Sequence, residues 1–233
     1  MPALIGRGVL TAANPLTIAP WLHAFWASDP SWTPPADGGE VTTWRDAGSA
    51  ATDAAKLSTT GPTFRASAAH YAGRPVVQFK TSNTLRTTAG STSTSARTVV
   101  AVGNIDTATA TMVDGASANS TGRLAVQNTT VLLVSRNTNV GVTGDTYDSD
   151  PHLWVCVFDG ASSTFHLDNV ALTVGSSPGT TAAAGMTLGS LRDGTASMAG
   201  SIAFAAVLDG AITSTQRDDL WGWASGAYGL RAE

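Results

Sequence analysis

Short stretches of alternating apolar and polar residues, separated by turn residues, run along most of the chain. A period of two places successive side chains on opposite faces of a strand. Turn pairs such as Pro34-Pro35, Asp114-Gly115 and Asp168-Asn169 interrupt the pattern, and short strands punctuated in this way predict an all-β sandwich or barrel. The predicted strands are Trp21–Ala27, Glu40–Asp46, Pro75–Phe79, Thr98–Gly103, Arg123–Gln127, Val131–Ser135, Leu153–Phe158, Thr164–Leu167, Val170–Val174, Met186–Leu188 and Ser201–Val207.

The segment Leu153–Phe158 departs from simple alternation because every residue in it is apolar. Trp154 and Cys156 fall on one face of the strand, and Leu153 and Val155 fall on the other. We therefore predict a central strand with a buried, structural Trp154. One face lies on the main core, and the other is covered by a C-terminal helix, a long loop or a partner subunit. Cys156 is the only cysteine and is predicted to be a small buried hydrophobe.

One segment near the C-terminus has helical rather than strand character. Thr213 and Gln216 have the spacing of a capping box, and the acidic pair that follows lies near the positive end of the helix dipole. Leu220 and Ala224 then share one face, and Gly226 is a stop signal. The pattern predicts a single short helix over residues 213–225, with its apolar stripe laid on the sandwich.

The first 18 residues have no clear hydrophobic period. Their apolar side chains include Leu4, Ile5 and Val9, while Pro2 and Pro15 break any regular helix. We interpret residues 1–18 as an N-terminal arm that either adds a strand to a neighbour's sheet edge or folds back onto its own sandwich. The amino-acid composition shows no abrupt change along the rest of the chain, so residues 19–233 are predicted to form one domain.

Charge and composition narrow the classes of function. Only 13% of the residues are charged, the net charge is −4, and no run of Lys or Arg is present. A nucleic-acid partner is therefore not expected, and no apolar stretch is long enough for a membrane span. The N-terminus lacks the charged and apolar regions of a secretory signal, and a lone cysteine allows no intrachain disulfide. These features favour synthesis in a reducing cytoplasm.

Several segments, taken in order, resemble the concanavalin A-like or LamG-like domains of bacterial surface proteins and bacteriophage structural proteins. This resemblance implies a two-sheet antiparallel jelly-roll sandwich closed by one short C-terminal helix. The loops depart from the family at Phe79-Lys80-Thr81 and Gly48-Ser49-Ala50-Ala51, which weakens any transfer of calcium or sugar ligands. The segments that carry the resemblance are Val41–Asp46, Gly61–Phe64, Gly73–Phe79, His152–Gly160, Phe165–Asp168, Gly200–Val207 and Tyr228–Leu230.

Catalytic patterns are sparse. Retaining glycosidases need two carboxyl groups about 5 Å apart, yet the chain has only two glutamates, Glu40 and Glu233. Ser-His-Asp catalysis is poorly supported, since the Gly-x-Ser-x-Gly match at residues 175–179 is not followed by a predicted helix, and the four histidines lack metal-ligand spacing. His152 and His166 belong to neighbouring predicted strands, which allows them to approach each other. The sequence therefore predicts no catalytic residues and no enzyme activity.

One acidic loop offers hard oxygen ligands for calcium. Asp145, Asp148 and Asp150 lie within six residues, although the loop lacks the glycine and terminal glutamate of an EF-hand. The favoured interpretation is an acidic, solvated loop without a metal, and calcium binding is the alternative. Calcium is the one cofactor that the pattern allows.

Aromatic residues in predicted loops are candidates for contact with carbohydrate or with a partner protein. Trp26, Trp32 and Tyr147 have this character, because exposed aromatic rings stack on sugars or anchor interfaces. The other tryptophans singled out, Trp21, Trp44, Trp154 and Trp221, are assigned to the core.

Three classes of function remain. The favoured one is a non-catalytic virion protein, a bacteriophage tail or capsid decoration component that is either structural or adhesive toward host-surface glycans. Its partners would be other virion proteins or further copies of the chain, joined through the N-terminal arm, and the protein would be made in the host cytoplasm. The alternative is a stand-alone carbohydrate-binding module. A glycan-cleaving enzyme is third, since the glutamates are missing.

Overall fold

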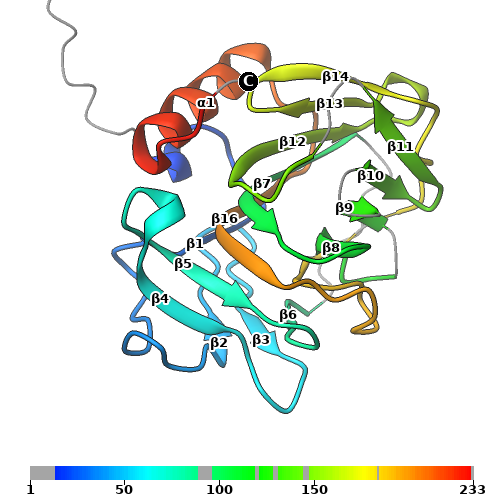
Figure 1. Ribbon diagram of the computed structural model, residues 1–233. Coiled ribbons are helices and arrows are strands. Elements are labelled where there is room, and N and C mark those ends of the chain that lie inside the picture. Colours follow the sequence, from blue (N-terminus) through cyan, green and yellow to red (C-terminus); the bar gives the residue numbers. More distant parts are fainter. Residues whose placement is uncertain are drawn as a thin grey trace, which may run out of the picture.

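The computed structural model describes residues 14–88, 96–118, 121–127, 131–143, 147–182 and 184–231. Residues 1–13 of the predicted arm, Asp145 of the predicted calcium loop and Glu233 lie outside the described residues. Figure 1 shows two facing layers of strands with one helix against them.

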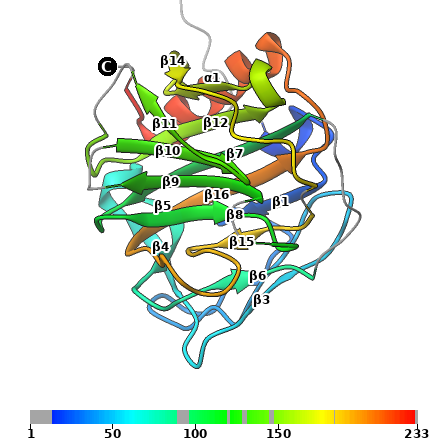
Figure 2. The ribbon, with the colours of Figure 1, turned by 90° about the vertical axis from the view of Figure 1, so that its right-hand side faces the viewer.

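All paired strands run antiparallel, and they form two layers (Figures 1 and 2). We call them the inner and the outer sheet. The inner sheet contains, in order, β4 (Thr63–Ala68), β5 (Arg74–Phe79), β16 (Gly200–Leu208), β7 (Arg97–Ile105), β12 (His152–Phe158), β13 (Thr164–Leu167) and β14 (Val170–Val174), with β1 (His23–Trp26) also paired to β16. The outer sheet contains β2 (Thr43–Trp44), β3 (Ala54–Lys56), β6 (Leu85–Arg86), β15 (Thr187–Leu188), β8 (Ala110–Asp114), β9 (Thr121–Gln127), β10 (Val131–Arg136) and β11 (Asn139–Thr143), and β11 pairs with β14. The predicted antiparallel all-β sandwich is confirmed.

The main core lies between the two sheets. Trp154 and Cys156 of β12 reach it from the inner sheet, and Met112 and Leu124 reach it from the outer sheet. Trp154 is fully buried, as predicted. Burial also raises the pKa of the Cys156 thiol, which therefore behaves as a small hydrophobe in the core.

A second core covers the opposite face of the inner sheet. Leu153 and Val155 of β12 pack there with Leu220, Trp223 and further side chains of α1 (Ser214–Tyr228). The cover predicted for the second face of β12 is therefore the C-terminal helix. This arrangement explains why β12 is apolar at every position: a strand buried on both faces has no solvent side.

The helix begins as predicted and ends later. The Thr213 side chain accepts a hydrogen bond from the backbone of Gln216, whose side chain in turn bonds the Thr213 backbone, so the capping box is confirmed. The predicted stop at Gly226 is wrong. The helix continues to Tyr228 and ends where Gly229 adopts a left-handed φ of 70° and donates to the Ser225 carbonyl. Within the described ranges, no helix is long and apolar enough to cross a membrane.

The hydrophobic pattern did not predict several of the strands. β3, β4, β6, β8 and β11 were not predicted, and the predicted strand Glu40–Asp46 is reduced to β2. β8 shows the reason, because all five of its residues are buried although Thr111 and Asp114 are polar. Tertiary hydrogen bonds satisfy these groups, so no alternation is visible in the sequence. Trp221, assigned to the core, is only half-buried at the edge of the second core.

The described end of the predicted arm packs on its own domain. Pro15 is buried in the short 3₁₀ turn η1 (Pro15–Thr17), and its carbonyl accepts a 2.8 Å bond from Nε1 of Trp21. Leu16 and Ile18 contact the second core. The alternative in which the arm folds back therefore holds for residues 14–18, while docking of residues 1–13 on a neighbour stays a prediction.

Two truncated chains separate the contribution of residues 14–18 to thermal stability from that of residues 1–13. Removing residues 1–18 should lower Tm by about 5 °C relative to removing residues 1–13, because it deletes roughly 2 kcal/mol of apolar contact in a chain of this size. Thermal unfolding followed by circular dichroism measures the difference. Equal Tm values for the two truncated chains would contradict the docking of residues 14–18 on the second core.

Candidate functional site

A polar cleft opens where β7 and β12 meet the short 3₁₀ turn η2 (Ala69–Tyr71) and the loop that leads into β12. It consists of two adjoining hollows of about 350 and 320 Å³, which share His70 and Asp150. The side chains of Arg65, Gln78 and Asp106 line one hollow. We call this double hollow the polar cleft.

One amide fixes the floor of the polar cleft. Asn104 donates to Asp106 Oδ1 at 2.6 Å and to the Ser149 carbonyl at 3.2 Å. Its oxygen accepts from the Tyr71 hydroxyl at 2.8 Å and from the Ser201 backbone at 3.1 Å. Both donor and both acceptor positions of the amide are therefore used. This network ties four separate segments together, so the cleft is preorganised.

Tyr147 lies in the loop that leads into β12, and its side chain is buried rather than exposed. Its side chain is 1% accessible, and its hydroxyl accepts a 2.7 Å bond from the backbone N–H of Ile105. The ring lies 5.3 Å from that of His152 and 5.2 Å from that of Trp154. Burial raises the pKa of Tyr147, so the phenol stays neutral. Tyr147 thus links the loop that leads into β12 to the main core.

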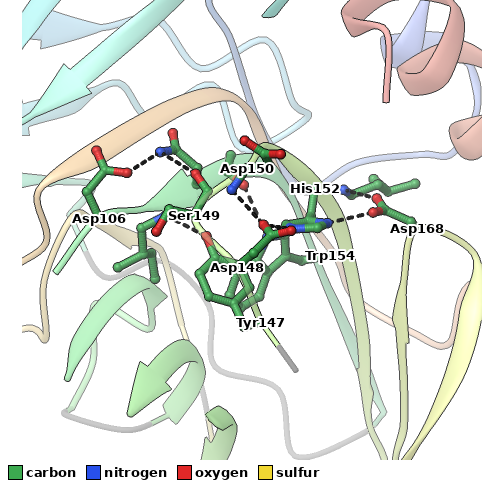
Figure 3. Close-up of polar contacts among 12 residues, drawn as sticks. Asp106, Tyr147, Asp148, Ser149, Asp150, His152, Trp154 and Asp168 are labelled. Carbon is green, nitrogen blue, oxygen red and sulfur yellow. Dashed lines mark hydrogen bonds and ion pairs between the residues drawn. The ribbon is translucent and has the colours of Figure 1, made fainter. Parts of the chain in front are cut away.

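His152 lies between two carboxylates (Figure 3). Nδ1 is 2.6 Å from Asp168 Oδ2, and Nε2 is 2.9 Å from Asp148 Oδ1. Carboxylates only accept, so both ring nitrogens must carry protons for both bonds to form. Burial alone would lower the pKa of His152, but Asp168 and Asp148 outweigh it and raise the pKa to about 9. His152 is therefore an imidazolium at neutral pH.

The same construction occurs a second time, on β1. Nδ1 of His23 lies 2.7 Å from Asp46 Oδ2, and Asp46 Oδ1 accepts from the backbone of the following residue, Ala24. At β12, Asp168 Oδ1 likewise accepts from the residue after His152. Each carboxylate thus fixes the first residues of a strand of the inner sheet. Of these two histidines, only His152 has a second carboxylate bonded to its other ring nitrogen within the described residues.

His166 does not join this cluster. It pairs with Val155 across β13 and β12 and therefore lies on the helix side of the inner sheet. Its Nε2 is 2.9 Å from Nη1 of Arg217, which can only donate, so this nitrogen must be unprotonated. Burial and Arg217 lower the pKa of His166. The approach of His152 and His166 that the sequence allowed does not occur, because the two rings lie on opposite faces of the inner sheet.

The prediction of exposed aromatic contact residues needs correction. Trp32 is 9% exposed and packs 5.8 Å from Trp44 and 5.7 Å from Phe64, and Tyr147 is buried as described above. Trp26 is half-buried, with Nε1 bonded to the Tyr228 hydroxyl at 3.1 Å. Turn residues around these rings suggested solvent, but large aromatic surfaces are buried against one another. A contact role for their remaining exposed edges stays a prediction.

The predicted calcium loop is only partly described. Asp148 Oδ1 is bonded to His152 and also accepts from the backbone of Asp150 at 2.6 Å, so a cationic side chain already faces it. Within the described part of the chain, no three His, Cys, Asp or Glu side chains are arranged to hold a metal ion. With Asp145 outside that part, calcium binding stays a prediction.

The residues that form the polar cleft were mostly missed. Asn104 and Asp106 follow the predicted strand Thr98–Gly103, and His70 lies in a short 3₁₀ turn. No spacing in the sequence relates them to Asp150. The available signal was a polar pair, Asn104 and Asp106, following the apolar run of β7. Polar residues at a strand end are common sites of ligand contact.

The charge on His152 predicts how stability depends on pH. The pKa is about 9 in the folded chain, against an ordinary value of 6.5, so the folded state holds the proton more tightly. This stabilisation is complete below pH 6.5 and is lost as the pH rises through 9. We expect the free energy of unfolding to fall by up to about 3 kcal/mol over this window. Urea unfolding at intervals of half a pH unit measures it, and a flat profile would contradict the assignment.

Comparison with known proteins gives relatives in structure alone. No family model matches the chain, and no curated protein matches it. A Trypanosoma rangeli sialidase in complex with the inhibitor DANA is similar over 87% of the chain and 33% of its own length, with a TM-score of 0.55 and 13% identity. The binding domain of botulinum neurotoxin DC in complex with SialylT is similar over 89% of the chain and 52% of its own length, with a TM-score of 0.58 and 7% identity.

A third similar structure is a GH54 α-L-arabinofuranosidase, with a TM-score of 0.57, 12% identity, and coverage of 89% of the chain and 59% of its own length. The chain thus spans between a third and about three-fifths of these proteins. At these identities the likeness shows the sandwich fold that the sequence resemblance implies. The LamG-like and bacteriophage affiliation stays a prediction.

Proposed function

We propose that the protein is a non-catalytic glycan-binding module and that the polar cleft is its binding site. The observation that carries the proposal is the pair of adjoining hollows lined by fixed planar polar groups. Arg65 and Gln78 supply guanidinium and amide donors, and Asp106 and Asp150 supply carboxylate acceptors. A sugar ring presents neighbouring hydroxyls that both donate and accept, so such a set matches it.

The structural relatives are consistent with this proposal. Two of them are complexes, one of a sialidase with the inhibitor DANA and one of a toxin's binding domain with SialylT. The sandwich fold hosts many functions, so the argument rests on the cleft rather than on the fold.

The non-catalytic part of the proposal rests on the carboxylates. Glu40 is engaged elsewhere, where it accepts from Nζ of Lys56 at 2.8 Å and from the backbone of Gly61. In the cleft, Asp106 is bonded to Asn104, and Asp168 is bonded to His152. Glycoside hydrolysis needs a carboxyl group free to protonate the leaving oxygen and a second that attacks or activates water. The proposal assigns the cleft carboxylates to hydrogen bonding instead.

A His70→Ala variant tests the cleft. His70 is exposed and belongs to both hollows, so its removal should leave Tm unchanged and weaken glycan binding at least tenfold. A glycan array identifies the strongest ligand, and isothermal titration gives its Kd for both proteins. Lys80→Ala, at an exposed residue outside the cleft, is the matched control and should bind as the wild type does.

Two outcomes would contradict the proposal. Unchanged affinity in His70→Ala would move the binding site away from the cleft. Release of shortened products from the bound glycan, abolished by Asp150→Asn, would make the protein an enzyme.

The finer part of the proposal is that this module belongs to a bacteriophage particle, as a tail or capsid decoration component. The support is the resemblance of the sequence segments to phage-borne domains. Sedimentation of purified particles tests it, since a virion component is recovered with them in fixed stoichiometry. Recovery of the protein only in the supernatant would leave the stand-alone carbohydrate-binding module.

A further inference from the structure

A third hollow lies away from the polar cleft, on the side of the molecule formed by β2 and the loop that precedes it. It has a volume of about 360 Å³ and is lined by Trp32 and the rings of Pro34 and Pro35, and by the polar side chains of Arg45 and Asp53. We call it the proline hollow. Figure 1 shows β2 and β3 at the end of the sandwich opposite α1, so this hollow and the helix lie far apart.

Two residues that line the proline hollow, Trp32 and Arg45, are fixed in place by contacts with buried side chains. Trp32 packs on Trp44 and Phe64 of the main core. Arg45 Nη1 donates at 2.6 Å to Asp29 Oδ2, and the Asp29 side chain is only 2% exposed. A buried carboxylate thus fixes the guanidinium in one orientation. The apolar wall and the main donor are therefore in place before any ligand arrives.

Polar groups at the hollow retain unused hydrogen-bonding capacity. Arg45 is 40% exposed, and its bond to Asp29 uses one of five N–H groups. Asp53 Oδ1 accepts from the Asp46 backbone, and within the described part of the chain its second oxygen has no partner. Glu40, which also lines the hollow, binds Lys56 and Gly61 through Oε1 alone. One donor and two carboxylate acceptors therefore face a space with an apolar side.

From this arrangement we infer that the proline hollow is a second saccharide-binding site, selective for an uncharged sugar. The rings of Pro34 and Pro35, with the exposed edge of Trp32, provide an apolar surface for the C–H face of a sugar ring. Arg45, Asp53 and Glu40 provide donors and acceptors for its hydroxyls. The two carboxylates disfavour a uronic or sialic acid by like-charge repulsion. The inference extends the proposed glycan-binding function to a separate site, so the protein binds two saccharide segments at once.

Filling the hollow tests the inference without disturbing the core. Thr43 is exposed on β2 and lines the hollow, and tryptophan is a favourable strand residue, so Thr43→Trp should fold normally and obstruct the site. Thr164→Trp, at an exposed position of β13, is the matched control. Asp53→Asn keeps an oxygen for the Asp46 backbone while removing the charge. Isothermal titration uses cellohexaose, xylohexaose and chitohexaose as neutral probes and hexagalacturonate as the acidic probe.

We expect at least one neutral hexasaccharide to bind the wild type, Thr164→Trp and Lys80→Ala with equal affinity, and to bind Thr43→Trp at least tenfold more weakly. Asp53→Asn should weaken the same ligand severalfold. Equal affinity in Thr43→Trp, no binding of any neutral probe, or loss of hexagalacturonate binding alone would overturn the inference. Failure of the polar cleft proposal is distinguishable, because it leaves the Thr43→Trp effect intact and removes only the effect of His70→Ala on other glycans.

Discussion

Replacement of Trp154 by alanine is expected to destabilise the protein by about 3–5 kcal/mol. The indole is fully buried in the main core, and its Nε1 donates to the Gly103 carbonyl at 3.2 Å. It also contacts the rings of Tyr147 and Phe165. The substitution removes the contacts and leaves a cavity, because the sheets on both sides cannot collapse onto it. For a chain of this length, Tm should fall by roughly 10 °C.

Trp221→Ala is the matched control for this experiment. Trp221 is half-buried at the outer edge of the second core, so the same change of residue should cost roughly 1 kcal/mol. Urea unfolding followed by circular dichroism measures both variants. Similar losses in the two proteins would show that β12 is not the central strand.

The second large effect is expected for Asp168→Asn, at about 3 kcal/mol, because breaking a buried charge pair leaves His152 without its main partner. The turn itself should survive. Asp168 and Asn169 have φ values of 47° and 67° in the two-residue turn between β13 and β14, and asparagine favours this conformation. The amide oxygen can still accept from the Leu153 backbone. The loss therefore reports on the charge of His152.

The dependence of stability on pH distinguishes loss of the His152–Asp168 charge pair from an unspecific loss of stability. Without Asp168, the pKa of His152 should fall, and the loss of stability between pH 6.5 and 9 should largely disappear. Asp46→Asn alters the equivalent carboxylate at β1, where His23 has no second carboxylate bonded to its ring. This control should keep the alkaline loss. A wild-type profile in Asp168→Asn would mean that another group is responsible.

The fold was largely predictable, since its central features depend on periodicity. The apolar run of β12 predicted a strand buried on both faces, and the capping box predicted the start of α1. The short strands of the outer sheet were not predictable. β3 and β6 have three and two residues, too few to display a period, and they exist because neighbouring strands pair with them.

The polar cleft was largely unpredictable for a different reason. Its members come from β4, β5, β7, β16, η2 and the loop before β12, and only the folded sheet brings them together. Tyr147 illustrates the difficulty, since its flanking aspartates suggested an exposed ring. The hydroxyl instead finds the Ile105 backbone, which makes complete burial of the ring favourable.

The pairing of β1 with β16 constrains the order in which the chain can fold during synthesis. His23 lies opposite Val207, and Trp26 donates to Tyr228, which is 202 positions away. β1 therefore cannot complete its pairing and packing until β16 and α1 have been synthesised. Long-range closure of this kind slows folding and leaves strand edges open to wrong partners. We therefore expect the unpaired edge of β1 to be exposed to misassembly until synthesis is nearly complete.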